Sequence, residues 1–356
     1  MLTADSHDIV GEKICHHSAY SNTGTSLFRA MLRRWRWRLT RVFHPKQPLC
    51  LNIFVTSRCT FSCFYCSRNI RADSPGGNHL YQDRSDFRIS DMSILLERYP
   101  SIKRVSFVGI GEPFLNEDLI PMARIAKERG KRVDVITNVS LLHRHWGEIA
   151  PNFDDVSISL HGLTAEELKR TAGVDAPMFD QFVSNVRHLC REERGINRAM
   201  IVRASVVTLR TDLNRLRRAA IFCAENGIQC LEVQNYLPYG LDDFKECVFD
   251  DDSQFITYLN GLIKEFIGVV EIVPPVLIKK DPRRMSWGCL SFFEVLRVDG
   301  IGHVCGCNRI MVPKPENGNF KECQDVWNNT YFLGFRRQWK SLRCLPDCCR
   351  WCPAAQ

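Results

Sequence analysis

The sequence of 356 residues has no long apolar run, no internal repeat and no low-complexity tract. Because a membrane-spanning helix needs about 18 or more apolar residues in succession, we expect none here. The opening residues, MLTADSHDIV, lack the basic start and apolar run of a secretory signal, so we expect a cytoplasmic protein. The net charge of +8 is modest for this length and does not indicate a nucleic-acid partner.

Cysteine, in contrast, is abundant, with 17 residues in the chain. Three of them fall within residues 59–66, and eight fall between Cys289 and Cys352. Disulfide-rich scaffolds are usually small and secreted, which does not describe this chain. Clustered cysteines in a chain of this kind therefore indicate metal ligands or reactive thiols.

Sequence patterns divide the chain into three predicted parts, residues 1–48, 49–250 and 251–356. The first part is a polar arm followed by a basic amphipathic stretch at 28–43, in which apolar residues recur at helical spacing and arginines fill the other face. Most amphipathic helices dock on the core of their own protein, and we favour that interpretation. A helix lying on a membrane surface is the alternative.

From residue 51 onward, short apolar strands alternate with amphipathic helices. The predicted strands cover residues 51–56, 104–110, 132–138, 155–160, 199–209 and 230–237, and the predicted helices cover 90–99, 117–129, 179–193, 213–227 and 253–267. Six such strand-then-helix units predict an α/β fold with a parallel sheet, either open or closed. In both cases the functional residues are expected at the carboxyl ends of the strands.

The first predicted strand runs directly into the segment SRCTFSCFYCSRN, in which Cys59, Cys63 and Cys66 have the spacing C-x3-C-x2-C. Soft thiolates favour iron–sulfur clusters or zinc. A closed structural site normally takes four protein ligands. This segment supplies only three cysteine ligands, so one metal position of such a site is left for a small molecule.

This segment, with the aromatic Tyr65 before the last cysteine, resembles the cluster loop of the radical S-adenosylmethionine (SAM) superfamily. The resemblance implies a partial (β/α)6 TIM-like barrel in which the three cysteines hold a [4Fe–4S] cluster whose fourth iron chelates SAM. In that family, one electron cleaves SAM and releases a 5′-deoxyadenosyl radical that takes hydrogen from a substrate C–H bond. An electron donor such as flavodoxin or ferredoxin is therefore an expected partner.

Further short segments resemble the family in the same order along the chain, over residues 50–240. The resemblance implies that the SAM-binding residues are Tyr65, Gly109, Gly111, Glu112, Asn138, Ser157 and Ser159. The sequence departs from the family pattern at two positions. Val139 replaces a usual glycine, and His161 replaces a usual aspartate.

The C-terminal cysteines resemble the SPASM or twitch extension of one branch of this superfamily, a small cysteine-rich β-hairpin/α domain. The resemblance implies an auxiliary [4Fe–4S] cluster held by Cys289, Cys305, Cys349 and Cys352, with Cys307, Cys344 and Cys348 as alternates. Eight cysteines permit two clusters by number, but the spacings favour one. A structural zinc ion is the alternative.

An auxiliary cluster that accepts an electron after hydrogen abstraction leads to oxidation (dehydrogenation) of the substrate, whereas a thiol that returns a hydrogen leads to epimerisation. Cys247 is the candidate hydrogen donor, and an inert structural cysteine is the alternative. We expect a small-molecule substrate, a sugar- or aminoglycoside-like natural product. A ribosomal peptide is the second expectation, and a non-catalytic zinc-binding protein is the third.

Overall fold

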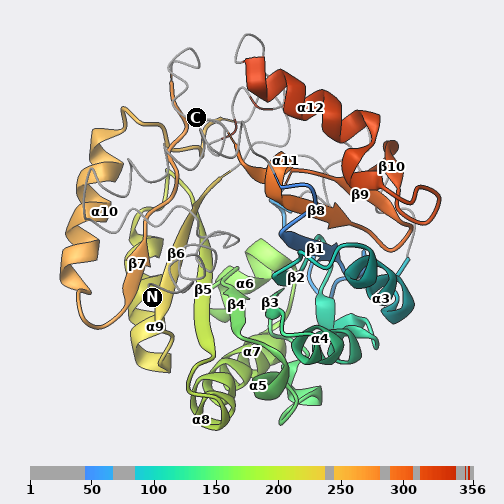
Figure 1. The fold of residues 1–356 in the computed structure, drawn as a ribbon. Helices are drawn as coiled ribbons and strands as arrows, with labels where there is room; N and C mark the ends of the chain where they lie inside the picture. Colours follow the sequence, from blue (N-terminus) through green and yellow to red (C-terminus); the bar gives the residue numbers. More distant parts are fainter. Residues whose placement is uncertain are drawn as a thin grey trace, which may run out of the picture.

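A single open sheet organises the molecule (Figure 1). The computed structural model describes residues 45–66, 85–236, 244–280, 289–307, 313–341, 349 and 352. Within this part, ten strands follow the spatial order β10-β9-β8-β1-β2-β3-β4-β5-β6-β7. Because β10 and β7 are edges, the sheet does not close into a barrel. The predicted α/β fold with a parallel sheet is confirmed.

The strands and helices alternate as the apolar pattern predicts. The strands are β1 (Cys50–Phe54), β2 (Arg104–Val108), β3 (Arg132–Thr137), β4 (Asp155–Ser159), β5 (Ile201–Thr208), β6 (Cys230–Asn235), β7 (Glu271–Val273), β8 (Val295–Val298), β9 (His303–Cys305) and β10 (Lys314–Asn319). The α-helices are α3 (Ile89–Arg98), α4 (Leu119–Glu128), α5 (Ile149–Asn152), α6 (Ala165–Ala172), α7 (Ala176–His188), α8 (Arg194–Ile196), α9 (Asn214–Asn226), α10 (Ser253–Glu265), α11 (Ser291–Glu294) and α12 (Thr330–Ser341).

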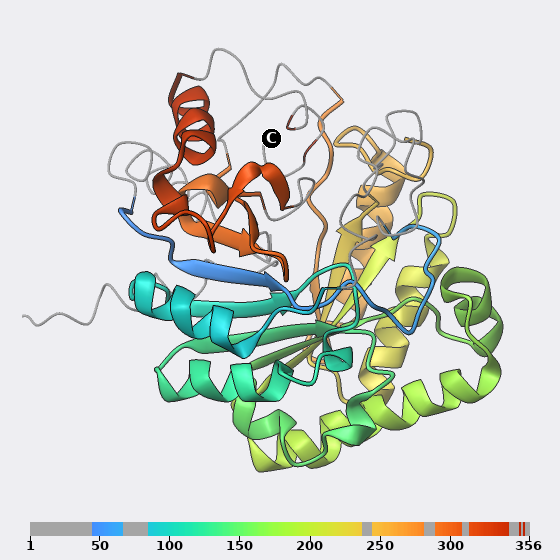
Figure 2. The same ribbon diagram turned by 90° about the vertical axis from the view of Figure 1, so that its right-hand side faces the viewer.

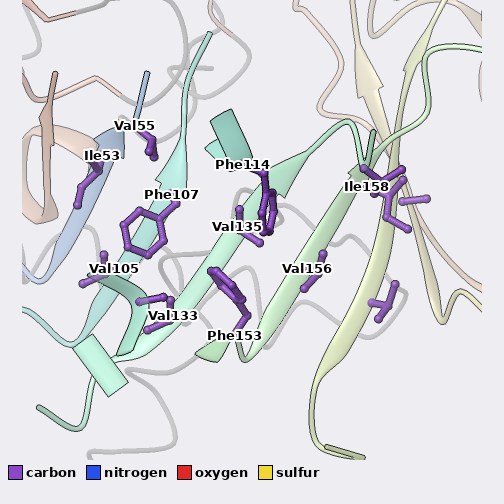
Figure 3. Close-up of a cluster of buried hydrophobic side chains, with 14 of the residues drawn as sticks. Ile53, Val55, Val105, Phe107, Phe114, Val133, Val135, Phe153, Val156 and Ile158 are labelled. Atoms are coloured by element: carbon purple, nitrogen blue, oxygen red, sulfur yellow. The ribbon is translucent and has the colours of Figure 1, made fainter. Parts of the chain in front are cut away.

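The connecting helices cover the outer face of the sheet (Figure 1), and the side chains between the sheet and these helices are apolar. Figure 3 shows this core, in which Val105 and Phe107 of β2 lie beside Val133 and Val135 of β3. Phe153 packs edge-on against Phe107, with ring centroids 6.3 Å apart. Each fully buried side chain of this kind contributes ~1.5–3 kcal/mol to stability. This packing fixes the strands on which the site is built.

Because successive residues of a strand point to opposite faces, the alternate residues of these strands line the inner face, which is apolar at the ends of β1–β3 (Phe54, Val108 and Ile136) and carries charged and hydroxyl side chains elsewhere. Near the amino ends of the central strands, Arg203 of β5 donates to Asp155 of β4 at 2.8 Å and to Glu232 of β6 at 3.0 Å. Arg104 of β2 donates to Asp134 of β3 at 3.1 Å. These buried pairs fill one end of the inner space and leave the carboxyl ends of the strands for the site.

The C-terminal part extends the same sheet on both sides. β7 pairs in parallel with β6, whereas β8 pairs in parallel with β1 and leads into an antiparallel hairpin with β9. Figure 2 shows the C-terminal elements, including α12, beside β1. The sheet therefore continues across residue 250, where the sequence predicts a boundary between two parts.

Two of the predictions concern residues outside the described ranges. The amphipathic stretch at 28–43 lies there, as do the alternate ligands Cys344 and Cys348. In the described ranges, every helix is too short or too polar to cross a membrane.

Candidate functional site

The three-cysteine loop follows β1 and is fixed to the end of α6. Cys63 is buried, and Cys59 and Cys66 are half-buried around Phe61. The loop backbone is bonded to that of α6, with Ser62 N donating to Ala172 O at 2.8 Å. A second such bond runs from Phe64 N to Thr171 O at 3.0 Å. The cysteines are therefore held at the carboxyl end of the sheet, as predicted.

The donor set of this loop fits an iron–sulfur cluster. Cys59 Sγ accepts hydrogen bonds from Phe61 N at 3.5 Å and from Asn138 Nδ2 at 3.7 Å, contacts that favour an anionic sulfur. In the part of the chain that the structure describes, no three histidine, cysteine or acidic side chains converge as they do around a single ion. A four-iron cluster binds each thiolate at a separate iron, so its ligands need not converge.

The glycine-containing loop after β2 packs directly on the cysteine loop. Gly109 has a φ of +135°, which side-chain-bearing residues rarely adopt. A Cβ at Gly111 would overlap the carbonyl oxygens of Thr56 and Arg58. The Glu112 amide donates to the Arg58 carbonyl at 2.8 Å. Glycine is thus required here for close backbone approach between two loops.

Glu112 joins the carboxyl ends of β2 and β3 through its buried side chain. Its carboxylate accepts from Thr137 Oγ1 and from the Asn138 amide, both at 2.7 Å. Burial raises the pKa of Glu112 to about 7, although these hydrogen bonds partly oppose the shift. Asn138 Nδ2 in turn donates to Thr60 Oγ1 at 2.9 Å. The predicted residues Glu112 and Asn138 therefore lie together beside the cysteine loop.

Val139, which stands where the family has glycine, keeps the backbone conformation of a glycine. Its φ is +56°, in the left-handed region that β-branched residues rarely enter. The side chain is fully buried, and the Val139 carbonyl accepts from Asn185 Nδ2 at 2.7 Å. Surrounding contacts thus hold a strained residue next to Asn138.

His161, which stands where the family has aspartate, contacts the cysteine loop. A hydrogen bond of 2.7 Å joins His161 Nδ1 to the hydroxyl of Tyr65, and Phe61 packs edge-on against the His161 ring. Loss of solvent contact, together with the Arg215 charge, lowers the pKa of His161 to about 4. Loss of solvent contact also raises the pKa of Tyr65 well above its usual range. The pair is therefore uncharged at neutral pH. Ser157 and Ser159 lie on β4, just before His161.

Three of the four predicted C-terminal ligands gather in a second place. Cys289, Cys349 and Cys352 pack in one cluster with Phe293 and Trp339. Cys289 Sγ accepts from the amide two residues further on, at Ser291 N, at 3.3 Å. This is the same local contact that Cys59 makes in the first loop.

Cys305 lies at the end of β9, in the main core. It pairs with Arg297 of β8, and residues opposed in an antiparallel pair share a face, so it lies on the same side of the sheet as Arg297. Cys305 Sγ accepts from Cys307 N at 3.3 Å, and burial raises the pKa of its thiol to about 12. Cys307, the alternate ligand, is also buried.

Cys247, the candidate hydrogen donor, is fully buried after β6. Its thiol donates to the Tyr236 carbonyl at 3.4 Å. Sequence reasoning missed two other residues of the site, namely Thr60 and Arg215. Arg215 donates to the His161 carbonyl at 2.8 Å. Its position on α9, in a basic helical face, carries no signal that separates it from a solvated arginine.

Comparisons with known proteins agree with this geometry. Residues 53–212 match the family model of the Radical SAM superfamily. The chain is 26% identical over 312 residues to the tungsten-containing aldehyde ferredoxin oxidoreductase cofactor-modifying protein of Pyrococcus furiosus, covering 80% of this chain and 82% of that one. It is 28% identical over 284 residues to the probable GTP 3′,8-cyclase of Saccharolobus solfataricus, covering 77% and 82%.

The fold is also similar to that of a solved structure. The crystal structure of Streptococcus suis SuiB bound to the precursor peptide SuiA aligns with a TM-score of 0.62 at 16% identity, covering 94% of this chain and 77% of that one. The sequence match and the three-cysteine loop at the end of β1 together establish that the chain carries a radical SAM domain, the kind of domain that uses S-adenosylmethionine and a [4Fe–4S] cluster.

Proposed function

We propose that this protein uses its radical SAM domain to oxidise a C–H position of its substrate. The observation that carries the proposal is the loop of Cys59, Cys63 and Cys66, fixed between the ends of β1 and α6 beside Glu112 and Asn138. When bound, the cluster and SAM supply a 5′-deoxyadenosyl radical that takes a hydrogen atom from the substrate. We assign Cys59, Cys63 and Cys66 as the cluster ligands.

The residues around the loop have positioning roles in this proposal. Glu112, Thr137 and Asn138 tie the loop after β2 to the end of β3, so that the backbone beside the cofactor does not shift. The hydrogen bond between Tyr65 and His161 holds the Tyr65 ring of the cysteine loop against the end of β4, and neither side chain adds a charge there. Such rigidity favours reaction, because a reactive radical must meet its C–H bond in a fixed geometry.

Oxidation is favoured over epimerisation by the placement of two cysteines. Loss of a hydrogen atom leaves a substrate radical that must still lose one electron and one proton to give a stable oxidised product, so an electron acceptor is needed. Cys305 shares a sheet face with Arg297, whose guanidinium lies 5.0 Å from the Phe54 ring on β1. We propose that Cys289, Cys305, Cys349 and Cys352 hold the SPASM- or twitch-type cluster that accepts this electron. Cys247, the alternative hydrogen donor, is also fully buried, and its thiol donates to the backbone carbonyl of Tyr236 at 3.4 Å, a contact expected of a structural cysteine.

For the substrate, we propose a small hydroxyl-rich metabolite of the sugar or aminoglycoside kind. The support is the hydroxyl groups on the inner face at the carboxyl ends of β4 and β5, where Ser159 lies beside Ser205 and Ser157 lies two residues before Ser159. Hydroxyl groups of this kind suit a ligand rich in hydrogen-bonding groups.

A peptide or protein substrate is the second candidate. It is favoured by the likeness in fold to SuiB, whose structure was solved with the precursor peptide SuiA. Under this proposal the chain is a maturase, and the same C–H chemistry takes place on a side chain of the peptide.

The test is anaerobic reconstitution followed by iron analysis and a SAM-cleavage assay. We expect about eight irons per chain and production of 5′-deoxyadenosine that requires Cys59. Unchanged production by Cys59→Ala would refute the assignment. With a substrate in hand, a product two hydrogens lighter supports oxidation, whereas deuterium uptake from heavy water at unchanged composition supports epimerisation. Binding of peptide precursors but not aminosugars would select the second candidate.

A further inference from the structure

Trp339 of α12 has a buried polar atom with no partner among the described residues. The side chain is 1% exposed, and its indole nitrogen Nε1 is shielded from solvent without a hydrogen-bond acceptor. An indole N–H can only donate, and a buried donor without an acceptor is unfavourable. Buried polar atoms of this kind are uncommon in folded proteins and call for an explanation.

The apolar cluster that contains Trp339 includes three cysteine sulfurs. Trp339 packs in one cluster with Cys289, Cys349 and Cys352 and with apolar side chains, namely Leu290, Phe293 and Phe335. Apart from the indole nitrogen, the only heteroatoms in these side chains are the three sulfurs. Neutral thiols are weak acceptors, whereas thiolates and the sulfides of an iron–sulfur cluster carry negative charge and accept N–H donors well.

We propose that Trp339 donates its indole N–H to a sulfur atom of the cluster held by Cys289, Cys349 and Cys352, and that this bond raises the reduction potential of that cluster. The inference rests on the proposed function, which assigns these cysteines as ligands. An N–H donor at cluster sulfur stabilises the reduced state, which carries the greater negative charge. A higher potential makes the cluster a better acceptor for the electron released in substrate oxidation.

The first test compares Trp339→Phe with a matched control in the reconstituted holoenzyme. Trp327 is the control, because it is also fully buried in the C-terminal part and its Nε1 already donates to the Pro45 carbonyl at 3.4 Å. Potentiometric titration followed by electron paramagnetic resonance measures the cluster whose signal does not respond to SAM. We expect a lower midpoint potential in Trp339→Phe and the wild-type potential in Trp327→Phe, at equal iron content. An unchanged potential in Trp339→Phe overturns the proposal.

The second test uses the wild-type protein and so does not depend on the folding of a variant. Pulsed electron–nuclear resonance on protein labelled with indole-¹⁵N tryptophan should detect a nitrogen coupling at the reduced, SAM-insensitive cluster. Absence of that coupling overturns the proposal. Absence of iron from the C-terminal cysteines overturns it as well, whereas SAM cleavage that depends on Cys59 would still support the radical SAM function.

Discussion

The two cysteine regions are built in different ways from the same local contact. In both, a cysteine sulfur accepts the backbone N–H of the residue two positions further on, as at Cys59 and Cys289. The first region is one loop of eight residues, held by polar groups such as the buried Glu112 and the half-buried Tyr65–His161 pair. The second brings together segments more than sixty residues apart, and its immediate neighbours, Phe293 and Trp339, are aromatic.

This difference has a chemical consequence. A contiguous loop with three cysteines leaves one iron position without a protein ligand, which suits a site that must bind and release a small molecule. Under the proposed assignment, four cysteines from distant segments would leave no iron of the second cluster without a protein ligand, which suits an electron acceptor. The first region should therefore respond to SAM, and the second should not.

The largest expected effect is that of Cys59→Ala, which separates the two regions directly. Loss of one of three ligands should remove the first cluster and lower SAM cleavage by about a thousandfold or more, since the electron that cleaves SAM comes from that cluster. Iron content should fall from about eight to about four per chain. Anaerobic 5′-deoxyadenosine assays and iron analysis measure both quantities. Retention of eight irons would mean that the cysteine loop is not a ligand set.

Cys352→Ala is the matched change in the second region. Iron should again fall to about four per chain, but SAM cleavage should stay within a few-fold of wild type because the first cluster is intact. Oxidised product should decrease by at least about a hundredfold, since its electron has no acceptor. Product analysis by mass spectrometry beside the cleavage assay gives the ratio. Equal loss of cleavage and product would show that the two regions are not independent.

The sequence predicts the first region better than the second, for a physical reason. Ligands within eight residues are local, so the spacing of Cys59, Cys63 and Cys66 after an apolar strand is enough to place them. The pairing of Glu112 with Thr137 depends on which strands are neighbours, and the contact of Tyr65 with His161 depends on tertiary packing. The inclusion of Trp339 among distant cysteines likewise follows from the packing of α12, which periodicity does not encode.

Glu112 should make the free energy of unfolding of the protein depend on pH. Its pKa is about 7 in the folded protein against an ordinary value of 4.5, so the folded state binds the proton more tightly. The resulting stabilisation of the folded state is at most about 3 kcal/mol. It is fully present below pH 4.5 and is lost as the pH rises through about 7.

Urea unfolding of the protein without cofactors at pH 5 and pH 8 measures this effect. Glu112→Gln should lose most of the dependence on pH, because glutamine does not titrate. Glu117→Gln, which changes an exposed carboxylate nearby, should behave as wild type. If Glu112→Gln shows the wild-type difference between the two pH values, the buried carboxylate is not its source.

The smallest expected effect concerns the hydrogen bond between Tyr65 and His161. Removing either partner takes one hydrogen bond from a site with little solvent, so Tyr65→Phe and His161→Phe should each destabilise the protein by roughly 1–3 kcal/mol. The double variant should be less destabilised than the sum of the two single variants, with a coupling of about 1 kcal/mol. Urea titrations of the four proteins give the coupling free energy. A coupling near zero would mean that the loop is held by its backbone bonds to α6 alone, and the two cysteine regions would then differ less than their side chains indicate.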